Sequence, residues 1–214
     1  MQAGSSREKT AMTRRISRRN LLFDGCYTHV FSRSFNGMYL FSEELDFEMF
    51  KELLSELKVE YGFRIHHYCL MNTHFHLLVS IPNVNGFSEA LAQIKFKYTK
   101  WVNRRMKRNG PLSRDRFKSM LVEDESYLYA CGLYIENNPV KAGLVDQPEA
   151  WAYSSRGYYV LNREDKLVDQ YDNREAPIGI DLTDNRFFEK GKVIGSKLFQ
   201  IQMEDIISQT VPVP

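Results

Sequence analysis

The sequence predicts an α+β fold in which helices pack on an antiparallel sheet. Segments of strand length alternate with segments of helical period in the order strand, helix, strand, strand, helix, strand, helix. The two consecutive strand-like segments are separated by only Met71-Asn72-Thr73, which predicts a hairpin. With 43% hydrophobic and 26% charged residues, the composition is that of an ordinary globular protein.

The first elements are a short strand and a helix. Residues 27–31 (YTHVF) are rich in β-forming residues and precede a turn rich in Ser, Asn and Gly. Residues 46–61 predict a helix, because apolar residues recur there at helical spacing. We expect Asp46 to be its N-cap and Gly62 to end it.

The remaining elements complete the pattern. Residues 63–70 and 74–81 form the two hairpin strands, residues 87–108 a long amphipathic helix, residues 116–123 a further strand and residues 124–138 a helix. This order fits the ferredoxin-like arrangement of an antiparallel sheet with helices packed on it.

Outside this core the sequence predicts two appendages. Residues 1–20 carry six basic and one acidic side chain without hydrophobic period and predict a flexible basic arm. Residues 21–160 form the predicted domain, and residues 161–214 form a C-terminal loop and helical extension. Within that extension, residues 162–186 are expected to be surface loop and residues 187–208 to add one or two helices.

Several classes of protein are excluded by composition. No apolar run is long enough for a membrane span, and the basic N-terminus lacks the apolar region of a secretory signal. The three cysteines, Cys26, Cys69 and Cys131, are widely spaced and match no zinc-binding pattern. They indicate buried thiols in a reducing compartment, which predicts a cytoplasmic protein.

Charge is strongly segregated along the chain. Residues 93–119 carry ten basic and one acidic side chain, a net charge of +9, although the whole chain carries only +2. Such a block indicates nucleic-acid binding. A solvated basic helix face explains the charge equally well at this point.

Two side-chain pairs could carry chemistry. His74 and His76 alternate on a predicted strand, so both imidazoles leave the same face and can converge on one ion, while Phe75 and Leu77 point to the opposite face. Half-buried histidines with ordinary hydrogen bonds are the simpler explanation of this pair alone.

The second pair lies on the last predicted helix. Tyr134 and Asn138 are four residues apart and share a helix face. By spacing alone, the better explanation is that Tyr134 belongs to an apolar stripe and that Asn138 caps the helix before Pro139.

Longer motifs resemble a known family. The stretch YCLMNTHFHLLV (68–79) resembles the histidine–hydrophobic–histidine motif of HUH nucleases, and GLYIENNPVKAGLV (132–145) resembles the tyrosine segment of single-tyrosine transposases, particularly those associated with repetitive extragenic palindromes (REP). SRDRFKSMLVED (113–124), YTHVFSR (27–33) and WAYSS (151–155) are similar to intervening and flanking segments of that family. The resemblance spans roughly residues 23–160.

The resemblance implies a mechanism. It implies that His74, His76 and Asn138 bind a divalent ion, Mg²⁺ or Mn²⁺, and that Tyr134 is the nucleophile. A phenol with an ordinary pKa of about 10 is a poor nucleophile at neutral pH, so positioning beside a polarised phosphate would have to assist it. The implied reaction cleaves and rejoins single-stranded DNA through a 5′-phosphotyrosine.

The resemblance also implies a partner, which is single-stranded DNA with hairpin structure and hence a nucleoid-associated location. The basic block would bind its phosphates, with Lys95, Lys97, Lys100, Arg104, Arg105, Lys107, Arg108, Arg114, Arg116 and Lys118 as candidates. Tyr98, Trp101 and Phe117 could stack bases, although each is better explained as a core residue. The alternative function is a non-catalytic hairpin-binding protein derived from a transposase, and a homodimer is left open.

Some positions depart from the family or fall outside its motifs. The family usually has asparagine directly before the first histidine, where this chain has Thr73; we expect an effect on turn geometry and not on metal binding. His29 on the first strand is a secondary candidate for the metal site. His66 and His67 are adjacent on a strand, so we expect them to face opposite sides and not to share a site.

Overall fold

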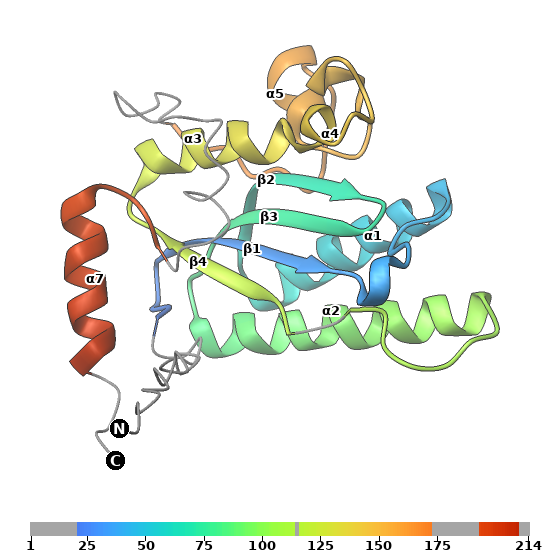
Figure 1. Cartoon of the computed structure of the whole chain (residues 1–214), viewed down its shortest axis with the longest axis horizontal. Helices are drawn as coiled ribbons and strands as arrows, with labels where there is room; N and C mark the ends of the chain where they lie inside the picture. Colours follow the sequence, from blue (N-terminus) through green and yellow to red (C-terminus); the bar gives the residue numbers. More distant parts are fainter. Residues whose placement is uncertain (1–20, 114–115, 173–192, 210–214) are drawn as a thin grey trace, which may run out of the picture.

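A computed structural model describes residues 21–113, 116–172 and 193–209 of the chain, with side chains described up to residue 203. The predicted basic arm and Arg114 lie outside these residues. Figure 1 shows a central sheet with helices on both sides, and helix α7 (Lys197–Gln209) stands beside strand β4 (Lys118–Val122).

The sheet has five strands in the order β2-β3-β1-β4-β5. Their bounds are β1 Tyr27–Arg33, β2 Arg64–Met71, β3 His74–Ser80, β4 Lys118–Val122 and β5 Val193–Ile194. The pairs β1–β3, β1–β4 and β2–β3 are antiparallel, whereas β4 and β5 are parallel. The first four strands have the ferredoxin-like order, which confirms the predicted fold class.

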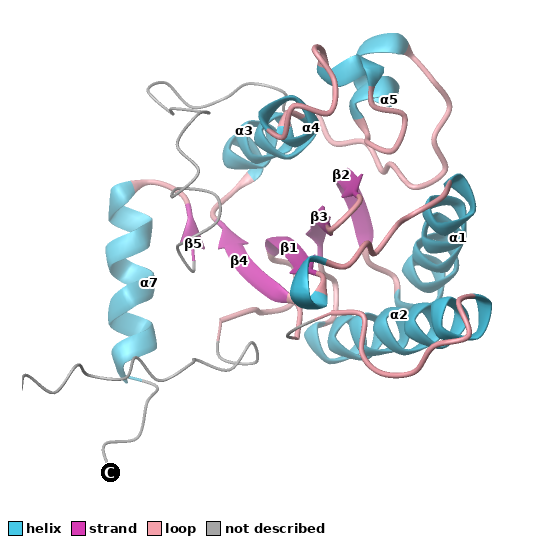
Figure 2. Ribbon diagram, turned by 45° about the vertical axis from the view of Figure 1, so that its right-hand side comes forward, coloured by secondary structure: helices cyan, strands magenta, loops and turns pink. Residues whose placement is uncertain are grey.

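Helices cover both faces of the sheet, as Figure 2 shows, with α1 and α2 on one side and α3, α4 and α5 on the other. The helix bounds are α1 Glu44–Tyr61, α2 Val84–Arg105, α3 Glu125–Glu136, α4 Asn138–Lys141, α5 Arg156–Leu161 and α7 Lys197–Gln209; short 3₁₀ turns are Phe35–Gly37 and Pro148–Ala150. Each face of the sheet therefore has its own hydrophobic core.

The start of α1 differs from the prediction. Its N-cap is Glu43, and Asp46 occupies the third helical position of a capping box. The Asp46 carboxylate accepts hydrogen bonds from the backbone N–H groups of Ser42 and Glu43. A carboxylate in the first turn accepts hydrogen bonds from unpaired backbone amides, as an N-cap does. Asp46 therefore marks the start of the helix as predicted, but the helix begins about one turn earlier. Gly62, at φ 71°, ends the helix in the left-handed conformation as expected.

The hairpin sets which side chains face which layer. A two-residue turn, Asn72-Thr73, joins β2 to β3, and β3 alternates as expected. Phe75 and Leu77 lie in the core beneath α1 and α2, whereas His76 faces the α3 side with Leu78.

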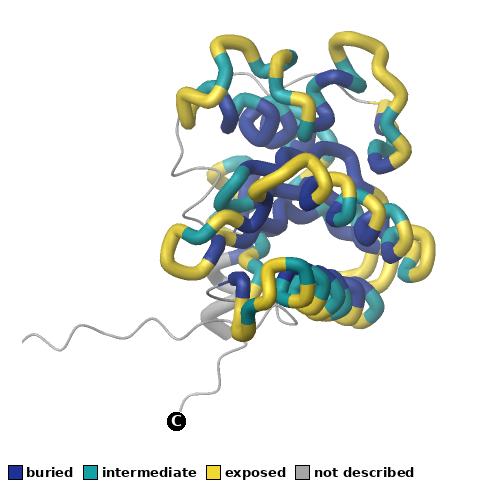
Figure 3. Tube along the Cα trace, turned by 90° about the vertical axis from the view of Figure 1, so that its right-hand side faces the viewer, coloured by how far each residue is buried: buried dark blue, intermediate teal, exposed yellow. Residues whose placement is uncertain are grey.

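The long helix α2 is amphipathic. Its buried residues are Phe87, Ala90, Leu91, Ile94, Tyr98 and Val102, which recur at intervals of three or four. Figure 3 shows that buried residues follow the strands and inner helix turns, while exposed residues follow the loops and outer turns. The predicted basic face of this helix is therefore left on the outside.

The C-terminal part contains elements that the sequence did not predict. The predicted helix 124–138 divides at Asn137 into α3 and α4, and a short strand, β5, precedes α7. Residues 162–172 form no helix, in agreement with the expected loop, while 173–192 lie outside the described residues. Cys26, Cys69 and Cys131 are buried free thiols, and no helix in the described ranges is long and apolar enough to cross a membrane.

Candidate active site and nucleic-acid interface

Three histidines gather on the α3 face of the sheet. The register pairs Phe31 with His76 and His29 with Leu78 across β1 and β3, so His29 and His76 lie diagonally on one face. Their rings stack with centroids 5.1 Å apart, and Nε2 of His29 lies 2.9 Å from Nδ1 of His76. The His74 ring lies edge-on to His76 at 5.2 Å. The secondary candidate His29 therefore touches the predicted pair.

His76 is buried and held neutral. Burial, followed by the neighbouring His29 and His74, lowers the pKa of His76 well below its ordinary value. Its Nε2 is buried and has no hydrogen-bond partner among the described residues. An unsatisfied buried nitrogen on a neutral imidazole has the protonation state that a metal ligand needs. This atom is therefore the clearest local sign of a missing ligand.

Thr73 contacts the first histidine directly. Its hydroxyl oxygen lies 3.1 Å from Nδ1 of His74, and its backbone carbonyl accepts a hydrogen bond from Ser34. Thr73 therefore contacts the imidazole of His74 in addition to taking part in the turn, where we expected its effect. Hydrogen bonds to Nδ1 orient a histidine that binds an ion through Nε2.

Tyr134 of the same chain faces this cluster. It lies in the last part of α3, and its ring is edge-on to His29 and His76 at centroid distances of 6.4 and 6.5 Å. The side chain is only 1% exposed. The Nζ of Lys141, at the end of α4, lies 4.0 Å from the centre of the Tyr134 ring. Lys141 is seven residues after Tyr134, a spacing that returns to the same helix face.

Asn138 adopts the capping role that spacing alone suggested. Its amide nitrogen donates hydrogen bonds to the carbonyls of Tyr134 and Ile135, the last turn of α3. Because the nitrogen is used in this way, the side-chain oxygen is the atom that would bind a cation. Capping and ligation are therefore compatible in one residue.

The donor set decides which kind of metal site could exist here. In the described part of the chain, no group of three or more His, Cys, Asp or Glu side chains could hold a metal ion. Among the described residues, a third protein ligand to His74 and His76 would be of another type, and an amide oxygen such as that of Asn138 fits this requirement. Two imidazoles and one amide oxygen leave coordination positions for a substrate oxygen.

A second buried polar cluster anchors the end of α3. Glu136 accepts at one oxygen from the Ser155 hydroxyl, 2.7 Å away, and contacts Nδ1 of His67 at 2.7 Å. Nε2 of His67 lies 2.8 Å from the Tyr171 hydroxyl, and the His67 ring stacks on Tyr159. Glu136 and His67 are each 1% exposed. The cluster ties the helix of Tyr134 to β2 and to the segment after α5.

The expected opposite orientation of His66 and His67 is wrong. The register of β2 shifts between Ile65 and His67, which marks a β-bulge. A bulge interrupts the alternation of side chains, and both rings contact Tyr171, at 5.5 and 5.6 Å. His66 is further held by the Asp169 carbonyl and the Ser80 hydroxyl. Neither histidine shares the cluster around His76.

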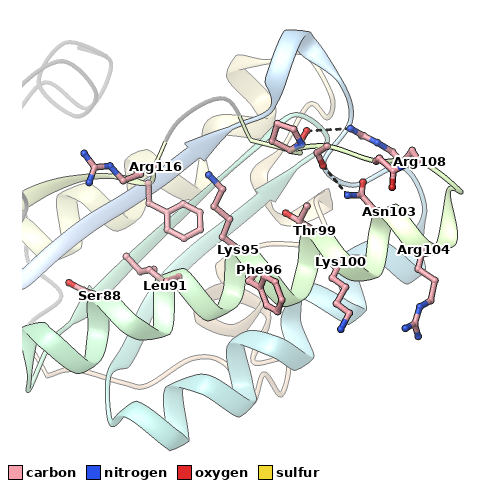
Figure 4. Close-up of a pocket in the computed structure, with 15 residues that line it drawn as sticks. Ser88, Leu91, Lys95, Phe96, Thr99, Lys100, Asn103, Arg104, Arg108 and Arg116 are labelled. Atoms are coloured by element: carbon pink, nitrogen blue, oxygen red, sulfur yellow. Dashed lines mark hydrogen bonds between the residues drawn. The ribbon is translucent and has the colours of Figure 1, made fainter.

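Half of the predicted DNA-binding residues surround one groove. It has a volume of about 830 Å³ and lies between α2 and residues 108–111 and 116–117 of the chain that follows. Figure 4 shows basic side chains from both walls of this groove. The members of the predicted set that line it are Lys95, Lys100, Arg104, Arg108 and Arg116.

The other predicted basic residues lie elsewhere. Lys97 pairs with Glu56 of α1 at 2.7 Å, and Arg105 pairs with Glu43 and with the buried Asp46 at 2.6 Å. These contacts hold α2 against α1, so we assign Lys97 and Arg105 a structural role. Lys107 is exposed after α2.

Lys118 lies apart from the groove, at the start of β4. It is exposed, and its Nζ lies 5.8 Å from the centre of the Phe31 ring.

The aromatic candidates divide in the same way. Tyr98 is a core residue whose hydroxyl donates to the Leu40 carbonyl, and Trp101 is half-buried under Arg105. Phe117 is half-buried and lines the groove. The sequence analysis missed Phe96, which also lines the groove and is 63% exposed.

The sequence analysis also gave no role in the site to Lys141 or Glu136, and it treated His29 only as a secondary candidate. The position of Lys141, seven residues after Tyr134, was an available signal.

Sequence comparisons with known proteins found two matches. A family model described as "Transposase IS200 like" matches residues 23–138. A curated protein of Haemophilus influenzae, "Putative REP-associated tyrosine transposase", is 27% identical over 139 residues, which cover 56% of this chain and 79% of that protein.

A solved structure, "Structure of the REP associates tyrosine transposase bound to a REP hairpin", matches with a TM-score of 0.57 and 18% identity. The match covers 74% of this chain and 95% of the other chain. At this identity the likeness establishes the fold.

Proposed function

Because the chain belongs to the IS200-like transposase family, we propose that it is a metal-dependent transposase that cleaves and rejoins single-stranded DNA through a 5′-phosphotyrosine. The observation that supports this most directly is the position of Tyr134. Within one chain, the Tyr134 ring lies beside His29 and His76. The buried Nε2 of His76 has no hydrogen-bond partner in the described residues.

The proposed ligands are Nε2 of His74, Nε2 of His76 and the side-chain oxygen of Asn138. For His76 to bind the ion through Nε2, its Nδ1 must carry the ring proton and donate a hydrogen bond to Nε2 of His29. Mg²⁺ or Mn²⁺ bound there would polarise the scissile phosphate and neutralise developing charge. His29 would then be a positioning residue that fixes the ring orientation of His76.

The chain's own residues account for the covalent step. The Tyr134 oxygen forms a bond to the phosphorus as the bond from phosphorus to the 3′-oxygen breaks. One proton leaves the phenol and one is taken up by the departing 3′-oxygen through solvent, so the step is balanced. Because one phosphodiester is exchanged for another, the reverse attack by a 3′-hydroxyl rejoins DNA without a further energy source.

Lys141 is suited to assist this step. Its ammonium group lies over the Tyr134 ring, where a positive charge stabilises both a phenolate and an approaching phosphate. The residue is exposed on α4, so it can move when DNA binds.

The proposed substrate is DNA with a hairpin and a single-stranded part. The hairpin in the description of the structural relative is a property of that protein, and it suggests the substrate class here. The five basic residues of the groove would neutralise phosphates, and binding would weaken steeply with salt.

The test is formation of a covalent adduct. The wild-type chain and Tyr134→Phe would be incubated with Mn²⁺ and labelled single-stranded hairpin DNA from the flanks of the gene, then resolved on a denaturing gel. We expect an adduct that requires Mn²⁺ and the Tyr134 hydroxyl, and that is strongly reduced in His76→Ala. Tyr127→Phe is the matched control, because Tyr127 lies on the same helix about 10 Å further along. An adduct that persists in Tyr134→Phe would refute the assignment of the nucleophile.

One observation favours a second candidate, a hairpin-binding protein without catalysis. Tyr134 is almost completely buried, whereas a nucleophile must reach the phosphate. The same experiment separates the two functions, because salt-sensitive hairpin binding without any adduct would support the second.

A further inference from the structure

The groove beside α2 combines charge with an apolar lining. In Figure 4, Lys95, Thr99 and Asn103 project from α2 toward the wall formed by residues 108–111 and 116–117, while Phe96 and Lys100 project from its outer side. Its volume of about 830 Å³ lies in the range of small-molecule sites. A surface that bound only phosphates would not need this volume or an apolar lining.

The apolar part of the groove is built to receive a flat group. Phe96 and Phe117 both line it, together with Leu91 and Pro111. Phe117 is fixed by an edge contact with Phe75 at 5.5 Å, whereas Phe96 is 63% exposed and has Lys100 Nζ 5.9 Å from its ring centre. An exposed aromatic beside a cation is the arrangement on which nucleic-acid bases stack.

A hydrogen-bond acceptor is also available. Asn103 donates from its side-chain nitrogen to the Gly110 carbonyl, which fixes the amide plane and closes the segment after α2. Its side-chain oxygen is buried and has no hydrogen-bond partner in the described residues. Asn103 lines the groove, so this oxygen is an acceptor in its wall that the described residues leave unused.

Charge and shape restrict the occupant. The five basic side chains of the groove oppose a second copy of the same basic surface and favour a polyanion. Within a duplex the bases are stacked on one another, so only an unpaired base can offer a face to Phe96. The groove therefore fits an unpaired nucleotide better than a duplex backbone.

The segment that lines the groove also leads to the active-site face. Phe117 faces the α2 side, and the next residue, Lys118, lies over Phe31 on the other side of the sheet. The register places Lys118 opposite Phe31, and Phe31 opposite His76. Two strand spacings, about 10 Å, separate Lys118 from His76. A strand of DNA leaving the site around Tyr134 can thus pass Lys118 and reach the groove.

We propose that this groove binds an unpaired nucleotide of the single-stranded DNA adjoining the hairpin, with its base stacked on Phe96 and its phosphates beside Lys100 and Arg116. The inference rests on the proposed function for the identity of the substrate. It adds a base-binding site on the face of the sheet opposite Tyr134.

The test measures binding separately from cleavage. Two fluorescently labelled DNA hairpins with the same stem, one blunt and one with a short single-stranded tail, would be titrated with the full chain carrying Tyr134→Phe, and anisotropy recorded. We expect Phe96→Ala to weaken binding of the tailed hairpin by about 5- to 100-fold, the usual effect of one lost stacking contact, and to leave the blunt hairpin unaffected. Phe23→Ala is the matched control, because Phe23 is 55% exposed and lies outside the groove.

A second variant tests the charge. Lys100→Ala should reduce the salt dependence for the tailed hairpin by roughly 0.7 in the logarithmic slope, the value for one phosphate contact on a single strand. Equal losses for both hairpins in Phe96→Ala, or none for either, would overturn the base-binding assignment. Adduct formation by the unaltered chain is recorded in parallel, so a failure of the groove and a failure of the nuclease mechanism give different results.

Discussion

Gly132 provides a sharp test of how the tyrosine helix is held. It lies in α3, where replacing glycine by alanine normally stabilises a helix by about 1 kcal/mol. Here a Cβ atom would lie 2.3 Å from Nε2 and 2.4 to 2.5 Å from two carbons of the His67 ring. The ring cannot move away easily, because it is hydrogen-bonded at both nitrogens and stacked on Tyr159 at 4.5 Å.

The expected sign is therefore destabilising. Overpacking typically costs about 1–3 kcal/mol, and displacement of His67 breaks two buried hydrogen bonds that contribute about 1 kcal/mol each. After the helical gain is subtracted, Gly132→Ala should lower the free energy of unfolding by about 2–4 kcal/mol. Urea denaturation followed by circular dichroism measures this value.

A double-mutant cycle isolates the cause. In a His67→Ala background the clash is absent, so Gly132→Ala should cost nothing or stabilise by up to about 1 kcal/mol. The reasoning is refuted if Gly132→Ala is as stable as the wild type, or if it costs the same in both backgrounds. The second outcome would place the problem in the helix itself and not in its contact with His67.

Three further predictions concern Lys141, Glu136 and His66. Lys141→Met should slow formation of the Tyr134 adduct by roughly 10-fold, equivalent to about 1.4 kcal/mol in the barrier, without lowering stability, whereas Lys166→Met, at another exposed lysine, should change neither; a rate equal to wild type would exclude the assistance proposed for Lys141. Glu136→Ala should destabilise the fold by about 2 kcal/mol, because buried partners lose their acceptor, and Glu136→Gln should recover part of it; equal losses in urea denaturation would show that hydrogen bonding to Glu136 is not what matters. Burial lowers the pKa of His66, so its contribution to stability is full above the unfolded-state pKa of about 6.5 and decreases as the pH falls below it; the free energy of unfolding should therefore decrease less between neutral and mildly acidic pH in His66→Gln, and parallel profiles would contradict this.

The fold could be predicted because its signals are local. The alternation of β3 and the helical spacing of α2 follow from the side chains alone, and the short connection between residues 70 and 74 fixes the hairpin. The strand β5 could not be foreseen, since it has two residues and exists only by pairing with Leu121 and Val122 of β4. The division between α3 and α4 was equally hidden, because it occurs at a single residue, Asn137, within a continuous apolar pattern.

For the candidate site, the spacing of residues predicted only which side chains share a face. Residues two apart on a strand share a face, and this rule anticipated His74 and His76 but not the contact with His29, which depends on the register between β1 and β3. Spacing also failed for His66 and His67, because a β-bulge interrupts the alternation that would place neighbouring residues on opposite faces. Phe96 was missed because nothing in the helix pattern shows that residues 108–111 and 116–117 line a groove beside it.

The way in which the proposed DNA substrate would reach Tyr134 depends on what holds two residues near it, Glu136 and Lys141. The end of α3 is fixed by Glu136, whose Oε1 is bound by the buried His67 and Ser155 and whose Oε2 lies 3.7 Å from Arg156, so moving the helix would break several contacts at once. Lys141 instead lies exposed on a helix of four residues, with its ammonium group over the Tyr134 ring. Displacing Lys141 is therefore the less costly way to uncover the phenol. A bound phosphate would also attract its ammonium group, so the substrate itself would supply the driving force. Burial of Tyr134 in the absence of DNA is thus compatible with catalysis.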